Sequence, residues 1–155
     1  MSYKIALVAL NEQTAPAFVT ETLARASIEL VIHECITRAE LEQCAGDADI
    51  VWSFGDCVAL TAENLDVMPR CGAIIRSGSG TDAIPVASAT ARGIVVINTP
   101  AAVSDAVSDH TIGLLFAVMR QIPARDRAVR AGKWERNLQA LRWHLLDQTL
   151  GLIGF

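Results

Sequence analysis

Short apolar runs recur along the first hundred residues, and each is followed by a helix-like segment. The runs occupy residues 5–10, 28–32, 48–52, 73–75 and 94–97. The first of them, at residues 5–10, is continuously apolar, which is typical of a strand buried on both faces. Strands that alternate with helices across short connections predict an α/β fold built on a parallel sheet. This alternation is the strongest constraint on what the chain can fold into.

Four helices are predicted between these strands, at residues 17–26, 38–44, 61–65 and 86–92. In the first of them, Phe18, Leu23 and Ala26 fall on one side and predict its buried face. Thr61 is the expected N-cap of the third helix. Gly93 is expected to close the fourth.

The pattern changes after residue 98, where we place a domain boundary. Pro100 forces an extended approach, and Ser104 or Asp105 is then expected to cap a long helix that reaches about residue 120. A shorter helix is predicted at 124–131, and a new buried strand at 149–153.

Composition excludes several classes of protein. Hydrophobic residues make up 52% of the chain and charged residues 19%, which supports a buried core and argues against disorder. The net charge of -4 argues against a nucleic-acid partner. No signal-peptide layout precedes the first strand, and the longest apolar runs are expected to be too short to span a bilayer. The expected location is therefore the cytoplasm.

The cysteines do not form a metal-binding pattern. They stand at positions 35, 44, 57 and 71, without a CxxC pair and without a histidine at ligand spacing. This arrangement argues against a zinc site, and we predict no metal. Cys35, Cys44 and Cys71 are expected to be small buried residues.

Two features invite a functional interpretation beside a plainer one. The loop Ser77, Gly78, Ser79 and Gly80 follows a strand, so its backbone N–H groups could form a nest for a carboxylate or phosphate. The plainer interpretation is a tight turn that needs positive φ. His110, near the expected crevice, is either a catalytic base or, with Asp109, a solvent-facing or capping pair.

Several segments, in order and at consistent spacing, resemble the NAD-dependent D-2-hydroxyacid dehydrogenase family, and most of all its phosphoglycerate dehydrogenase branch. They are 76–82 (RSGSGTD), 89–100 (ATARGIVVINTP), 109–115 (DHTIGLL), 120–123 (RQIP), 130–134 (RAGKW) and 149–154 (TLGLIG). The resemblance covers about residues 48–155, and the first 47 residues agree only in pattern.

The resemblance implies a flavodoxin-like parallel sheet as substrate domain over residues 1–98. Residues 99–155 would hold the interdomain helix, a dimerisation arm and the first strand of a truncated, Rossmann-type NAD-binding domain. The substrate, a small 2-keto or 2-hydroxy acid, would place its carboxylate on the backbone of residues 77–80. Ser104, Val107 and Gly154 would lie toward the NAD cofactor. The family's catalytic Arg, Glu and His lie beyond the first Rossmann strand, so no catalytic residue is carried over to this chain.

Two positions depart from the family pattern. Gly55 and Asp56 stand where relatives often carry an Arg-Ser pair that holds the substrate, and a carboxylate there would repel an anion. Val103 stands where many relatives have Asn. Both departures put the usual substrate set in doubt.

Two hypotheses of function follow. In the first, the chain is the truncated front portion of a D-2-hydroxyacid dehydrogenase and is inactive alone. In the second, it is a non-enzymatic α/β module that binds a small anion and dimerises. The apolar helix from Val107 to Val118 supports self-association in either case, and a homodimer is expected. A general flavodoxin-like binding protein is a more distant alternative.

Overall fold

A computed structural model describes residues 3–134 and 145–153 of the chain. The chain divides into two compact units, Met1–Val103 and Ser104–Phe155, and each is described by itself.

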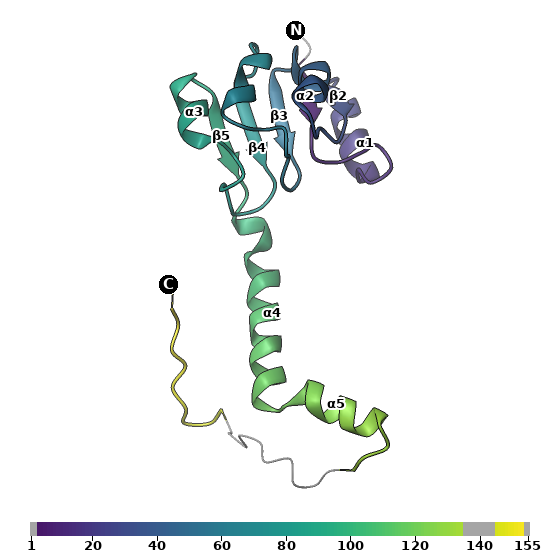
Figure 1. The fold of residues 1–155 in the computed structure, drawn as a ribbon, viewed down its shortest axis with the longest axis vertical. Helices are drawn as coiled ribbons and strands as arrows, with labels where there is room; N and C mark the ends of the chain where they lie inside the picture. The colour runs from purple at the N-terminus through teal and green to yellow at the C-terminus, as the bar shows by residue number, and fades with distance from the viewer. Residues whose placement is uncertain (1–2, 135–144, 154–155) are drawn as a thin grey trace. The chain divides into compact units, whose positions relative to one another are not determined.

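The first unit is built on a five-stranded parallel sheet (Figure 1). Its strands are β1 (Lys4–Leu7), β2 (Glu29–Ile32), β3 (Ile50–Ser53), β4 (Ala73–Arg76) and β5 (Val95–Asn98). All four pairings are parallel, and the strand order is β2-β1-β3-β4-β5. This is the flavodoxin-like order, so the predicted α/β class and parallel sheet are confirmed.

Helices follow the strands as the alternation predicts. They are α1 (Ala17–Arg25), α2 (Arg38–Ala45), the 3-10 helix η1 (Glu63–Val67) and α3 (Val86–Ala91). A capping box starts α2: the hydroxyl of Thr37 accepts the backbone N–H of Glu40, and the Glu40 carboxylate accepts the N–H of Thr37 at 2.8 Å. Gly93, at φ +76°, ends α3 as predicted.

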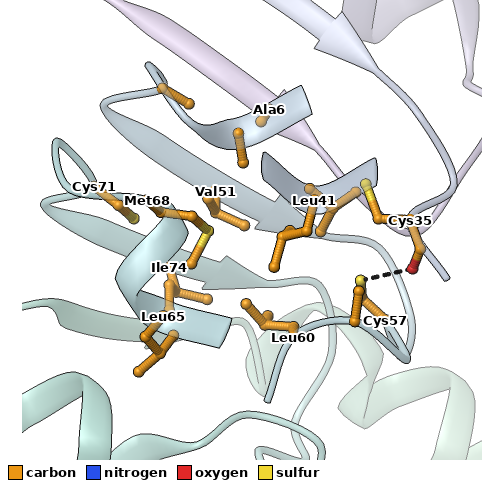
Figure 2. Close-up of a cluster of buried hydrophobic side chains, with 14 of the residues drawn as sticks. Ala6, Cys35, Leu41, Val51, Cys57, Leu60, Leu65, Met68, Cys71 and Ile74 are labelled. Atoms are coloured by element: carbon orange, nitrogen blue, oxygen red, sulfur yellow. Dashed lines mark hydrogen bonds between the residues drawn. The ribbon is translucent and has the colours of Figure 1, made fainter. Parts of the chain in front are cut away.

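The core of this unit lies between the sheet and the segment formed by α2 and η1 (Figure 2). Leu41, Val51, Leu65, Met68 and Ile74 are each at most 1% exposed. All four cysteines are free thiols buried in or beside this cluster, as predicted for three of them. Burial raises the pKa of the thiols at positions 57 and 71, so these cysteines serve as packing residues.

Two predictions for the helices of this unit are wrong. On α1 the buried side chain is Val19, whereas Phe18 is 68% exposed and Ala26 is exposed. Val19 is thus the single buried position of α1. Thr61 does not cap an α-helix: η1 begins after Ala62, without a side-chain cap.

The long helix α4 (Ala101–Met119) starts earlier than predicted. The N–H of Ala102 bonds the carbonyl of Thr99, and the N–H of Val103 bonds that of Pro100. Proline is pre-organised for a helix start and needs no donor there, so Ser104 and Asp105 lie inside the helix and are not its caps.

The second unit continues along α4 and α5 (Ile122–Arg130), and it contains no buried residue in either helix. Gln121 adopts the left-handed conformation between the two helices, and Gly132 lies at φ +71° after α5. The predicted division into a long and a shorter helix is therefore confirmed, although α5 begins at Ile122, before the predicted 124. The dimerisation arm was predicted within residues 99–155, of which 135–144 and 154–155 lie outside the described residues.

Apolar content sets α4 apart from the other helices. With 19 residues and a mean hydropathy of 1.2, it is long and apolar enough to cross a membrane, by length and composition alone. The expectation that no apolar run is long enough to do so concerned uninterrupted runs; in α4, Asp105 and Asp109 interrupt those runs, while the mean hydropathy still reaches 1.2.

Residues 149–153 do not form the predicted buried strand. Leu150 is 59% exposed and Leu152 66% exposed. A strand needs a neighbouring strand to satisfy its N–H and C=O groups, and no described residue pairs with this segment. An apolar run alone was not sufficient to predict a strand.

A carboxylate at the amino ends of the strands, that of Asp49, makes the stability of the fold depend on pH in the acidic range. The Asp49 carboxylate accepts the backbone N–H of Lys4 at 2.9 Å and bonds Arg70 at 2.7 Å. These bonds, the first above all, lower the pKa of Asp49. Its contribution to stability is therefore complete above the unfolded pKa of about 3.9 and is lost as the pH falls through the lower folded pKa.

We expect Asp49→Asn to make the free energy of unfolding less dependent on pH below about pH 5, since one depressed carboxylate is gone. Urea unfolding at a series of acidic pH values measures this. Parallel curves for the variant and the parent protein would contradict the assignment.

Candidate functional site

The candidate site lies where β3 and β4 end, at the carboxyl edge of the sheet. Ser53 pairs with Arg76 in the sheet register, so the loops that follow these two strands begin side by side. The N–H of Ser77 bonds the carbonyl of Ser53 at 3.0 Å. In open α/β sheets this edge is where ligands bind.

Side chains of β3, of β5 and of the residue that follows β5 hold the loop 77–80 in place. The indole N–H of Trp52 donates to the hydroxyl of Ser77 at 2.8 Å. From the end of β5, the amide of Asn98 donates to the carbonyl of Ser79 at 2.8 Å. Thr99 bonds Gly78 twice: its hydroxyl accepts the Gly78 N–H at 2.8 Å, and its N–H donates to the Gly78 carbonyl at 2.9 Å.

These bonds leave a smaller nest than the glycine spacing predicts. The N–H groups of Ser77 and Gly78 are already bonded, to Ser53 and Thr99. The N–H groups of Ser79 and Gly80 have no partner among the described residues, and both residues are exposed. These two amides are the donors that remain for an anion, and substrate binding by residues 77–80 stays a prediction.

A fixed cation lies under the loop. The guanidinium of Arg76 donates to the carbonyl of Ser77 through Nη1, and its Nη2 lies 3.3 Å from the carboxylate of Asp56. Gly78, at φ +124°, leaves room for Nη1, which would lie 2.2 Å from an added Cβ. Gly78 therefore serves both the turn and the seating of Arg76.

Other predicted positions lie apart from this loop in the sequence and belong to the second unit. Ser104 and Val107 are the fourth and seventh residues of α4, and Val107 is 59% exposed. His110 and Asp109 are exposed on the same helix, which favours the solvent-facing interpretation and rules out capping. Gly154 lies outside the described residues. No cluster of three or more potential metal ligands occurs within residues 3–134 and 145–153.

A polar hollow opens beside the carboxyl ends of β1 and β2, and sequence reasoning missed it. It is lined by Asn11, Glu12, Gln13, Ile32 and His33. These residues carry no recognisable motif, so no sequence signal pointed to them, and they include none of the predicted site residues.

Comparison with known proteins decides the family. The family model for the catalytic domain of the D-isomer specific 2-hydroxyacid dehydrogenases matches residues 6–148. The chain belongs to this family. The match reaches into the first 47 residues, where the resemblance rested on pattern alone.

Individual relatives of this chain support the same family. A D-3-phosphoglycerate dehydrogenase from Archaeoglobus fulgidus is 40% identical over 93 residues, which are 60% of this chain and 18% of the relative. A glyoxylate reductase from Pyrococcus furiosus is 32% identical over 133 residues, covering 77% of this chain and 37% of the relative. The chain thus spans well under half the length of these relatives.

A solved structure supports the same assignment. The NADPH-dependent glyoxylate/hydroxypyruvate reductase of Sinorhizobium meliloti, in complex with NADP and malonate, superposes with a TM-score of 0.70 at 28% identity. The superposition covers 88% of this chain and 40% of that one.

The described residues of this chain do not themselves fit the dinucleotide. A Rossmann-type site needs a strand, a glycine-rich turn and the N-terminus of a helix. Residues 149–153 form neither strand nor helix, and Ile153 is fully exposed. No step of the reaction is therefore assigned to NAD within this part of the molecule.

Proposed function

We propose that this chain supplies the substrate-binding part of an NAD-dependent oxidoreductase that interconverts D-2-hydroxy acids and 2-keto acids. The match of the family model to residues 6–148 carries this proposal. It favours an enzyme over the non-enzymatic anion-binding module.

In this proposal the substrate carboxylate accepts the N–H groups of Ser79 and Gly80. Two adjacent amides without a partner among the described residues suit a carboxylate, which has acceptor oxygens and no donor. Ser77 and Gly78 hold the loop through their bonds to Trp52 and Thr99. The rigid backing matters, because a substrate positioned for reaction cannot tolerate a loop that moves by an ångström.

The cofactor would be held mainly by a further part of the enzyme. We assign Ser104, Val107 and Gly154 to the side that faces it, as the family resemblance implies. When bound, NAD supplies the hydride acceptor or donor. The catalytic Arg, Glu and His belong to that further part, so this chain contributes binding and orientation.

The assembly and location are also proposals. The exposed apolar side chains of α4 support a homodimer or cover by another domain, in preference to a membrane. Four free thiols support the reducing cytoplasm. The net charge of -4 supports a small-molecule substrate over nucleic acid.

Activity measurements test the proposal. We expect the purified 155-residue chain to oxidise no NADH with glyoxylate or hydroxypyruvate above the rate without protein, because the acid/base and the polarising cation are missing. A complete glyoxylate reductase serves as the positive control. Turnover by the chain would contradict the proposal that this chain binds the substrate while a further part supplies the catalytic residues. Light scattering that gives the 16.6 kDa monomer mass would contradict the homodimer.

A further inference from the structure

The charge around the loop 77–80 bears on which acids it accepts. Three charged side chains lie at this loop: Arg76 bonds the Ser77 carbonyl and pairs with Asp56, and Asp82 lies beside Gly80. One cation and two carboxylates leave the surroundings of the loop with a net negative charge. An anion there depends on the amides and is opposed by the side chains.

Arg76 is not available to a ligand, although its charge suggests a substrate clamp. Its Nη1 is bonded to the carbonyl of Ser77, and its Nη2 contacts the carboxylate of Asp56. The arginine side chain is only 20% exposed, whereas that of Asp56 is 74% exposed. The ion pair therefore presents its negative partner to solvent.

Asp82 adds to this effect from the other end of the loop. Its Oδ2 lies 3.6 Å from the position of a Cβ on Gly80, beside one of the two unpartnered amides. Asp82 makes no ion pair among the described residues. Carboxylates thus lie near both ends of the loop: Asp56 pairs with Arg76, which bonds Ser77, and Asp82 lies beside Gly80.

We propose that this loop selects 2-hydroxy and 2-keto acids whose only anionic group is the carboxylate, and rejects phosphorylated ones. The inference rests on the proposed function. An acid with a single carboxylate gains two amide hydrogen bonds, and Asp56 and Asp82 repel only that one negative charge. A phosphorylated acid carries a further charge of about −1.5 to −2, so the same two side chains repel it much more.

The selection is tested by titrating the chain with glycolate and with 3-phosphoglycerate while backbone amide NMR signals are followed at constant ionic strength. We expect the signals of Ser79 and Gly80 to shift with glycolate, and the affinity for 3-phosphoglycerate to be lower. Asp56→Asn should raise the affinity for glycolate about threefold and that for 3-phosphoglycerate about tenfold, because charge–charge energy scales with ligand charge.

Asp47→Asn is the matched control. Asp47 is also an exposed carboxylate paired with a cation, Lys4, but it lies at the amino ends of the strands. This variant should change neither affinity. Two results would overturn the proposed selectivity: tighter binding of 3-phosphoglycerate than of glycolate by the parent chain, or equal gains in affinity for both acids in Asp56→Asn. The proposal that this loop binds the substrate would still stand. If no acid shifts Ser79 or Gly80, the substrate loop of the proposed function fails, and the selection fails with it.

Discussion

Ile74→Ala is expected to destabilise the protein by about 2–5 kcal/mol, the largest effect of any single change considered. Ile74 is fully buried in β4, within the cluster that includes Val51 and Leu65 (Figure 2). Its truncation removes apolar contacts and leaves a cavity that the strands on either side cannot close. A whole domain is stable by only about 5–15 kcal/mol, so the loss is a large fraction of the total.

Ile97→Ala provides the comparison, since it makes the same substitution in the neighbouring strand β5 at a side chain that is 44% exposed. We expect it to cost about 1 kcal/mol or less. Urea unfolding followed by circular dichroism measures both variants. Equal losses for the two would show that burial in this cluster does not determine the stability of the sheet.

Gly78→Ala is expected to destabilise the protein by about 1–3 kcal/mol, through backbone strain and the displacement of Arg76. At φ +124° a side chain is strained whatever the space, and the added Cβ would lie 2.2 Å from the Nη1 of Arg76. The guanidinium would then have to leave the Ser77 carbonyl, so the loop would lose the hydrogen bond that Arg76 donates to it. Unfolding free energy and the amide signals of residues 77–80 measure the two parts of the effect.

Gly80→Ala in the same loop is the matched control. Its φ does not favour glycine, and its nearest neighbour would be Asp82 at an ordinary contact distance of 3.6 Å. We expect a change within about 0.5 kcal/mol, because the substitution reduces the entropy of the unfolded chain without straining the fold. A loss as large as that of Gly78→Ala would mean that both glycines are required by the turn.

The site was predictable in location but not in detail. The glycine spacing at 78 and 80 indicated a turn at the end of a strand, and the parallel order placed that turn at the carboxyl edge of the sheet. Which amides are available depends on Thr99, and the charge of the loop depends on Asp56, which lies 20 positions before Arg76. Contacts between residues so far apart in the chain leave no local pattern.

The sequence by itself determined the five strands, the helices between them and the parallel α/β class, because hydrophobic period and turn residues act over a few neighbouring positions. It did not determine where α4 begins, which side of α1 is buried, or whether residues 149–153 form a strand. The start of α4 follows from local bonds to Thr99 and Pro100. Tertiary structure decided the other two, since burial and strand pairing depend on what lies opposite in space. The ion pair of Asp56 with Arg76 belongs to the same group, and it sets the charge that a substrate meets at the loop.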